Sequence, residues 1–472
     1  MKKIRIICLF FLVSLLAGIF TPAVMAEPAD LSVTGGCHSV DASMQLSDAK
    51  DLTETAKAVI VYELGSDTMI YNHNPDQRIY PASMVKLMTA LVALEKGNLT
   101  EKVAVTKRAL SYVAVGSVSA GLVAGEELTL KDLLYCLMTA SANDAATVIA
   151  EHIGGSQAGF IKMMNERAKE LGCKDTNYTN VHGLHEEETY TTARDICRIL
   201  DFALDNPEFK AMFTAESYTV PATNKHEERV IYTSNYMMSR QTVKKYYDER
   251  VTGGKTGSTS QAGRCLAATS KGKGMELLTI VMGAEATYEA DGLAVRTFGS
   301  FEDTKALLDY VLENFEYRQI LFEGQILSQH PVEGGENSVF TKPVETASTV
   351  LPVNLDVTKL TWIYADNLGS LKAPIEAGQK ISSVQVWYGS LCLAQADLVA
   401  ANAVRVWSAP VDDRIGSGVT FASVMRVIGW VFLVIVIIAA VVFGILFLPR
   451  LLRRFRILRM RRKRRQNRRR MK

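Results

Sequence analysis

The chain has 472 residues, which is too long for one ordinary domain, so two folded domains with additional segments are expected. Its 48% hydrophobic and 22% charged residues are typical of a globular protein. The net charge of +3 excludes little, because it averages three unlike regions. Residues 1–26 and 450–472 hold only basic charges, whereas the stretch between them has 36 Lys and Arg against 50 Asp and Glu.

Residues 1–26, MKKIRIICLFFLVSLLAGIFTPAVMA, have a basic head, an apolar middle and an ending of small residues. This pattern predicts a secretory signal peptide cleaved after Ala26; a retained membrane helix is the alternative. Residues 27–52 have a weak pattern and are interpreted as a linker.

The segments that follow predict a mixed α/β domain over residues 53–318. Residues 56–74 form two β-rich runs around a Gly-Ser-Asp turn, which indicates a hairpin. Helices are expected in five segments: 81–98, 130–140, 143–155, 156–173 and 191–204. Thr129 and Asp132 resemble a capping box, and Ser156 is a candidate cap. Residues 251–285 read as three strands and 301–315 as a closing helix, so the sheet is expected to be antiparallel.

The remaining part of the chain predicts a small all-β domain and a membrane anchor. Residues 319–408 contain β-rich runs and no strong helix, and 409–426 form a spacer. Residues 427–448 carry no charge over 22 positions, which is long enough for a transmembrane helix. The basic tail, 449–472, predicts a cytoplasmic end and an extracytoplasmic body. Nucleic-acid binding by this tail is the alternative; beside a membrane span, contact with anionic lipid is favoured.

Three short motifs stand out in the first domain. Ser83-Met-Val-Lys86 places a serine and a lysine one helical turn apart in an apolar segment. Ser141-Ala-Asn143 lies between two predicted helices. Lys255-Thr256-Gly257 lies among glycines that allow close backbone approach to a ligand. The set S-x-x-K, S-x-N and K-T-G in this order is the signature of penicillin-binding proteins and class A β-lactamases.

The longer segments YPASMVKLMTA, ASANDAA, NVHGLHEEETYTTARD and GGKTGSTSQAGRCLAAT sharpen the resemblance. Residues 53–318 resemble serine-type D-alanyl-D-alanine carboxypeptidases, the low-mass penicillin-binding proteins. The β region resembles that family's C-terminal domain through LKAPIEAGQKISSVQVWYGS, but matches poorly between 325 and 365. The resemblance implies a β-lactamase/transpeptidase-like domain, then the small all-β domain and the transmembrane helix.

The chemistry expected at these motifs centres on Ser83. A serine hydroxyl needs a base, and a lysine amine, with an ordinary pKa of about 10.4, is neutral at physiological pH only when burial or a nearby cation lowers that pKa. The apolar neighbours of Lys86 supply burial and Lys255 supplies the cation, so Ser83 is the predicted nucleophile and Lys86 its general base. Ser141 would pass a proton to the departing amine.

The substrate-binding roles follow from the same resemblance. Asn143 would orient Lys86 and the substrate, while Lys255 and Thr256, followed by Gly257, would hold the terminal carboxylate. The N–H groups of Ser83 and Ser258 would form the oxyanion hole. The expected substrates are peptidoglycan stem peptides ending in D-Ala-D-Ala, with β-lactams as covalent inhibitors and no cofactor.

Two other functions and one other site remain open from the sequence. A β-lactamase of class A needs a deacylating glutamate, usually in an E-x-x-L-N segment, and none follows Asn143; Glu166 and Glu170 read as surface residues. A membrane-bound sensor acylated by β-lactams or muropeptides would need an effector domain that the tail lacks. His182 and His185, followed by Glu186, Glu187 and Glu188, invite a metal interpretation, but a loop of the resembled family is the favoured interpretation.

Overall fold

The computed structural model describes Ser47 and residues 52–240, 243–289, 295–365, 370–389, 391–408 and 424–442. The predicted signal peptide, most of the linker, most of the spacer and the basic tail lie outside these residues. The chain divides into two compact units, one that ends at Val406 and one that begins at Trp407.

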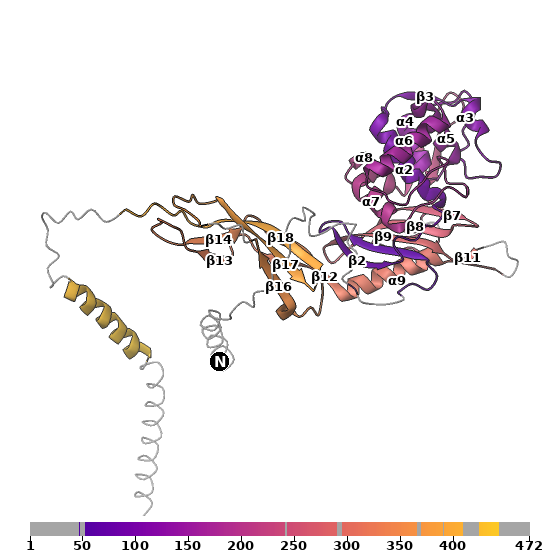
Figure 1. Cartoon of the computed structure of the whole chain (residues 1–472). Coiled ribbons are helices and arrows are strands. Elements are labelled where there is room, and N and C mark those ends of the chain that lie inside the picture. The colour runs from indigo at the N-terminus through magenta and orange to yellow at the C-terminus, as the bar shows by residue number, and fades with distance from the viewer. Residues whose placement is uncertain are drawn as a thin grey trace, which may run out of the picture. The chain divides into compact units, whose positions relative to one another are not determined.

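A five-stranded antiparallel sheet organises the first domain, in the order β2-β1-β9-β8-β7 (Figure 1). Its strands are β1 (Ala58–Glu63), β2 (Thr68–His73), β7 (Val251–Thr259), β8 (Gly263–Gly272) and β9 (Met275–Ala284). Lys273 and Gly274, with φ of 49° and 80°, connect β8 to β9 in the left-handed conformation that two-residue hairpin turns require. The predicted hairpin and the predicted antiparallel sheet are confirmed, and β7 forms one edge of that sheet.

Helices cover both faces of this sheet (Figure 1). The alternation of side chains along β1 sends Ile60 toward a helical cluster and Val59 toward α9. The helical segments are η1 (Ala82–Met84), α2 (Val85–Lys96), α3 (Lys107–Ser111), α4 (Leu130–Met138), α5 (Asn143–Gly154), α6 (Gln157–Glu170), α7 (Ala193–Ala203), α8 (Pro207–Phe213) and α9 (Gly299–Asn314). Helix α2 is buried on every side from Val85 to Ala93, so it forms the centre of the helical cluster.

Local hydrogen bonds explain where several helices begin. Thr129 and Asp132 form a complete capping box at α4, and the Ser156 side chain accepts a hydrogen bond from the Gly159 N–H at α6. Both predicted caps are confirmed. Three short strand pairs were not predicted: β3 (Lys102–Ala104) with β4 (Glu127–Thr129), β5 (Ser217–Val220) with β6 (Arg229–Tyr232), and β10 (Ala286–Tyr288) with β11 (Val295–Phe298).

A small all-β domain follows α9, as predicted. Its elements are β12 (Phe315–Leu321), β13 (Ser328–His330), β14 (Val339–Pro343), β15 (Ala347–Pro352), η2 (Val357–Lys359), β16 (Leu360–Tyr364), β17 (Lys380–Tyr388) and β18 (Leu391–Ala400). Strands β12 and β15 pair with each other, and the others form the sheet β13-β14-β18-β17-β16. Thr349 of β15 and Thr68 of β2 share a hydrogen bond of 3.1 Å between their hydroxyls.

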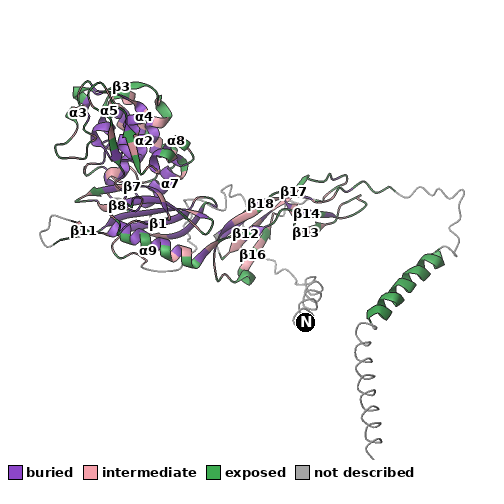
Figure 2. Ribbon diagram, turned by 180° about the vertical axis from the view of Figure 1, so that it is seen from behind, coloured by how far each residue is buried: buried purple, intermediate pink, exposed green. Residues whose placement is uncertain are grey.

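The second unit contains one described helix, Val424–Val442. This helix of 19 residues is long and apolar enough to cross a membrane, and all of its residues are exposed (Figure 2). It begins three residues before the predicted span, whose last residues, 443–448, lie outside the described part of the chain. In the first unit, Cys136, Cys173, Cys197 and Cys265 are free thiols.

Candidate active site

Ser83 and Lys86 lie together where η1 leads into α2. Lys86 is completely buried, and its Nζ donates hydrogen bonds to Ser83 Oγ at 3.1 Å and to the His182 carbonyl oxygen at 2.6 Å. Ser83 is only half-buried, so its hydroxyl remains accessible on one side. Ala82, just before it, has a φ of 48°, a conformation that costs free energy for a residue with a Cβ and is frequent at functional sites.

The environment of Lys86 favours its neutral form. Burial lowers the pKa of Lys86 well below its ordinary value, Lys255 lowers it further, and Asp144 opposes these effects. Burial and Lys255 are the two causes that the sequence suggested. A neutral amine beside a serine hydroxyl can accept its proton, which is the requirement for a general base.

The second motif lies in the turn between α4 and α5. Ser141 has a φ of 59°, and its Oγ accepts a hydrogen bond of 2.9 Å from Lys255 Nζ. Asn143 is buried, and its backbone N–H donates to the Val118 carbonyl oxygen at 2.8 Å. The structure gives Lys86 the His182 carbonyl as its second partner, and within the described residues no hydrogen bond joins the Asn143 side chain to Lys86. Among the described residues, the Ser141 hydroxyl is hydrogen-bonded to Lys255 Nζ, and no hydrogen bond joins it to Lys86.

The third motif runs along β7, at the edge of the sheet. Lys255 is buried, and burial lowers its pKa to about 7. Thr256 Oγ1 lies 2.5 Å from Ser234 Oγ, and Ser258 Oγ accepts a hydrogen bond of 2.8 Å from Arg264 Nη1. A Cβ at Gly257 would lie 3.0 Å from the Pro81 carbonyl oxygen. This glycine thus allows β7 to approach the turn that carries the nucleophile, a packing role that differs from the expected approach to a ligand.

The segment 180–185 closes the site from the other side. Asn180 Oδ1 accepts hydrogen bonds from the N–H groups of Gly183 at 2.7 Å and His182 at 3.3 Å, which turns the His182 carbonyl toward Lys86. Burial lowers the pKa of His182 to about 4, with a smaller contribution from Lys86 in its protonated form, so the ring is neutral near pH 7. Among the residues that the structure describes, no group of three His, Cys, Asp and Glu side chains could hold a metal ion.

The geometry agrees with what the comparison with known families finds. The sequence model described as D-alanyl-D-alanine carboxypeptidase, peptidase S11, matches residues 44–286, which is more than half of the chain. The chain belongs to the D-alanyl-D-alanine carboxypeptidase family. A second model, the C-terminal domain of penicillin-binding protein 5, matches residues 315–406.

Individual members of the carboxypeptidase family are similar over most of their length. The D-alanyl-D-alanine carboxypeptidase DacA of Haemophilus influenzae is 30% identical over 359 residues, covering 74% of this chain and 85% of that protein. DacF of Bacillus subtilis is 29% identical over 363 residues, covering 75% and 87%. The crystal structure of penicillin-binding protein 5 from Haemophilus influenzae matches with a TM-score of 0.58 and 29% identity, covering 74% of this chain and 98% of that one.

Three contributors to this carboxypeptidase-family site were missed from the sequence. The first is the His182 carbonyl, which no sequence pattern could indicate because every residue has a backbone carbonyl. Ser234 lies in the loop after β6, far from any motif. Arg264 lies opposite Ser258 in the β7–β8 pair. Once the β7–β8 hairpin is assigned from the sequence, its register could have indicated Arg264 as a neighbour of the site. Its guanidinium lies 5.0 Å above the Phe298 ring, and no described carboxylate pairs with it.

Gly183 gives a direct test of how closely this loop approaches the nucleophile. Its φ is 86°, and a Cβ there would lie 1.8 Å from the Ala82 carbonyl oxygen. We expect Gly183→Ala to lower the free energy of unfolding by more than about 2 kcal/mol and to slow acylation of Ser83, because the loop or the turn must move. Thermal unfolding and penicillin labelling would measure both effects.

Gly172→Ala is the matched control for this substitution. Gly172 has a φ of 78°, but nothing lies within 4 Å of the position of its Cβ. It carries the same backbone strain of about 1–2 kcal/mol without the contact. Equal losses of stability and unchanged acylation in both variants would contradict the close approach.

Proposed function

We propose that this chain is a serine-type D-Ala-D-Ala carboxypeptidase that removes the terminal D-alanine from peptidoglycan stem peptides through an acyl-enzyme on Ser83. The observation that carries the proposal is the convergence of three distant motifs. Lys86 Nζ lies 3.1 Å from Ser83 Oγ within the first motif, and Lys255 Nζ lies 2.9 Å from Ser141 Oγ, which joins the third motif to the second. A Cβ at Gly257 would lie 3.0 Å from the Pro81 carbonyl oxygen, so the third motif also lies against the turn that carries Ser83. Family membership supports the same reaction.

The acylation step follows from these contacts. Neutral Lys86 takes the proton of Ser83 as Oγ attacks the carbonyl carbon of the penultimate D-alanine, forming the new C–O bond. The N–H groups of Ser83 and Ser258 would stabilise the oxyanion, where one donor is typically worth about 3 kcal/mol. The C–N bond then breaks as Ser141 passes its proton to the departing D-alanine amine and takes a proton from Lys255, its hydrogen-bond donor. Lys86 keeps the proton of Ser83 and returns it to Oγ when water hydrolyses the ester, and the proton that water loses passes through Ser141 to Lys255.

The terminal carboxylate of the substrate would bind beside β7. Lys255 and Thr256 supply a cation and a hydroxyl, and Arg264 adds a second cation on the face of the sheet where Ser258 points. Water then hydrolyses the ester and regenerates Ser83. A β-lactam would acylate the same hydroxyl, but its amine remains tethered to the acyl group after the ring opens, so the adduct is expected to persist.

Export and anchoring complete the proposal. The predicted signal peptide would bring the body across the membrane, and the apolar helix Val424–Val442 would retain it there. The basic residues that follow would keep the tail cytoplasmic, leaving the catalytic domain extracytoplasmic.

The test uses the full chain in detergent with a pentapeptide ending in D-Ala-D-Ala and, separately, with a chromogenic cephalosporin. We expect repeated release of free D-alanine, with cephalosporin acylating the protein once and turning over slowly. Stoichiometric acylation without D-alanine release would instead support the sensor, and rapid cephalosporin turnover would support a β-lactamase. Glu166 and Glu170 are exposed on α6, so neither is placed as a deacylating base.

A further inference from the structure

Asp144 is a buried carboxylate that directly follows the second motif, in the first turn of α5. It is 1% exposed, and its side chain accepts four hydrogen bonds. The donors are Ser119 Oγ at 2.5 Å and the N–H groups of Ala120, Leu122 and Ala145, each at 2.9 Å. Because backbone N–H groups can only donate, this set of partners suits an ionised carboxylate.

These hydrogen bonds fasten the segment 118–122 to the start of α5. The Val118 carbonyl oxygen accepts a further hydrogen bond from the Asn143 N–H, at 2.8 Å. The N-cap residue of α5, Ala142, makes no side-chain cap, so Asp144 supplies an acceptor for this helix start. Segment 118–122 and the second motif therefore form one hydrogen-bonded unit, which Ser141 joins to Lys255 of β7.

The charge of Asp144 matters because the site contains two buried lysines. Lys86 and Lys255 are both buried, and neither forms an ion pair with a described residue. A buried ammonium is costly without a compensating anion. Burial lowers the pKa of Lys86, Lys255 lowers it further, and Asp144 is the carboxylate that raises it. Asp144 therefore favours the ammonium form of Lys86, against the two stronger effects.

Two other titratable groups close to this pair are neutral near pH 7. Burial lowers the pKa of His182 to about 4, so its imidazole is uncharged. Burial raises the pKa of the Cys136 thiol, on α4, to about 12, so this group is uncharged as well. Lys255 and Asp144 are then the described charged groups that act on Lys86 from the elements packed around it.

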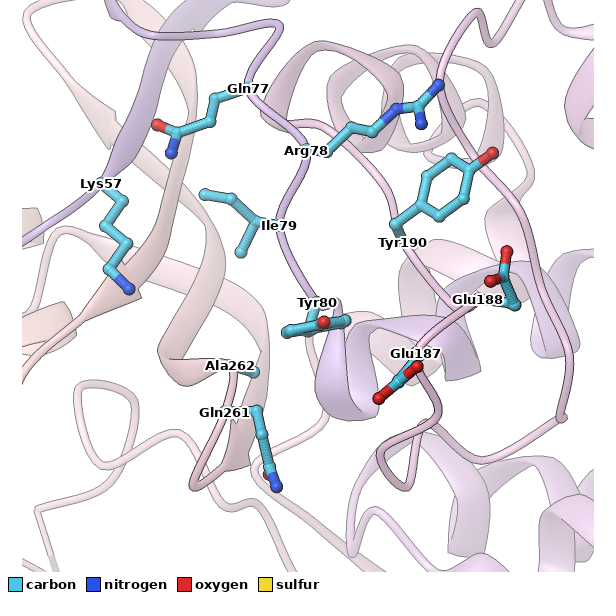
Figure 3. A pocket seen from close by; sticks show the side chains of 10 residues that line it. All are labelled: Lys57, Gln77, Arg78, Ile79, Tyr80, Glu187, Glu188, Tyr190, Gln261 and Ala262. Carbon is cyan, nitrogen blue, oxygen red and sulfur yellow. The ribbon is translucent and has the colours of Figure 1, made fainter.

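Other carboxylates near the motifs face solvent. Glu187 and Glu188, which follow His182 in the chain, are exposed and line a cavity of about 440 Å³ (Figure 3). Glu95 is exposed at the C-terminal end of α2. Water and salt screen exposed charges of this kind. Among the described residues, the compensating anion for Lys86 is therefore the buried Asp144.

We propose that Asp144 is a positioning residue of the reaction, which fixes segment 118–122 and balances the positive charge that Lys86 acquires from Ser83. This inference rests on the proposed function. During acylation the Ser83 proton moves to Lys86 Nζ as Oγ bonds to the carbonyl carbon, while Asp144 stays ionised and takes no proton. The anion stabilises the new ammonium, which makes Lys86 a stronger base than it would be without Asp144.

Asp144→Asn keeps the shape of the side chain and removes its charge. We expect acylation at the pH optimum to slow by about tenfold, because the amine becomes a weaker base. We also expect the acid limb of the acylation rate to move to lower pH, because Lys86 loses the anion that favours its protonation. A purely structural role would lower the rate without moving the limb.

Stopped-flow acylation of the full chain in detergent by a chromogenic β-lactam, followed over a range of pH, measures the rate and the limb. Titration of the Lys86 Nζ resonance shows whether the limb belongs to Lys86. Asp144→Ser is the second variant in case Asp144→Asn does not fold. Its hydroxyl keeps one acceptor for the N–H groups, and it must show the same displacement of the limb.

Two control variants separate charge from packing. Ser119→Ala removes one hydrogen bond from the same segment but keeps the carboxylate, so its acid limb should coincide with that of the wild type. Asp303→Asn changes another buried carboxylate, on α9, which accepts hydrogen bonds from the Glu54 N–H and the Thr55 hydroxyl. Asp303 is not among the groups that act on Lys86, so both rate and limb should be unchanged.

Three results would overturn the role of Asp144. They are an acid limb at the same pH in Asp144→Asn and the wild type, an equal displacement in Ser119→Ala, and a wild-type limb below the pH of acid unfolding. In the last case Asp144 would not keep Lys86 able to take a proton. If the limb moves as expected but a pentapeptide ending in D-Ala-D-Ala releases no D-alanine, the hydrolase function fails while the role of Asp144 stands.

Discussion

Ser83→Ala abolishes covalent labelling by penicillin and lowers the rate of D-alanine release by roughly 10⁴-fold or more, with the fold preserved. Among the described residues, the Ser83 hydroxyl is the side-chain group hydrogen-bonded to Lys86 Nζ, at 3.1 Å, and burial lowers the pKa of that amine. Because Ser83 is half-buried in a single turn of 3₁₀ helix, removing one oxygen leaves no large cavity. Mass spectrometry of the intact protein after incubation with penicillin measures the outcome.

Ser258→Ala is the matched control for this prediction. Ser258 lies in the same site, but its Oγ only accepts a hydrogen bond from Arg264, and its proposed role uses the backbone N–H. This variant should still gain the mass of one penicillin. A penicillin adduct of normal stoichiometry on the Ser83→Ala protein would show that the nucleophile is another residue.

Lys86→Met lowers the acylation rate by about 10²–10⁴-fold, the usual contribution of a general base. Methionine matches the length of the lysine stem, so the buried volume is nearly kept, although the His182 carbonyl loses a partner. The rate loss therefore reflects the missing amine rather than a collapsed site. Stopped-flow acylation with a chromogenic β-lactam measures it, and a rate within threefold of the wild type would contradict the base assignment.

The same variant changes how stability depends on pH. The pKa of Lys86 is lower in the folded than in the unfolded protein, so the unfolded state binds more protons between the two values. The wild type therefore loses stability as the pH falls through this window, and Lys86→Met lacks that loss. We expect the difference in Tm between variant and wild type to shift in favour of the variant as the pH falls from alkaline to neutral. A difference that is independent of pH would show that Lys86 titrates normally.

Local patterns made much of this fold predictable. The helix starts at Thr129 and Ser156 were readable because caps depend on side chains within three residues. The β1–β2 hairpin and the strands β7, β8 and β9 were readable because each has a long β-rich run. The three-residue strands β3 and β4 carry too few residues for a period to show, and tertiary contacts decide their conformation.

The candidate site divides in the same way. Ser83 and Lys86 could be identified because both lie within one helical turn, and the motif order brought in Ser141 and Lys255. The His182 carbonyl, the positive φ of Ala82 and Ser141, and the pairing of Arg264 with Ser258 depend on how distant segments meet. Gly257 was recognised as a position of close approach, but what approaches it, the Pro81 carbonyl, is a property of the assembled domain.

The central claim is that Lys86 carries no charge when Ser83 reacts, and direct titration of lysine Nζ by nuclear magnetic resonance tests it best. The resonance of Lys86 is identified as the one that disappears in Lys86→Met. We predict that this resonance titrates far below the ordinary lysine pKa, because Lys86 is buried and close to Lys255. Titration at the ordinary value for lysine would contradict the account, since the amine would then be protonated and unable to activate Ser83.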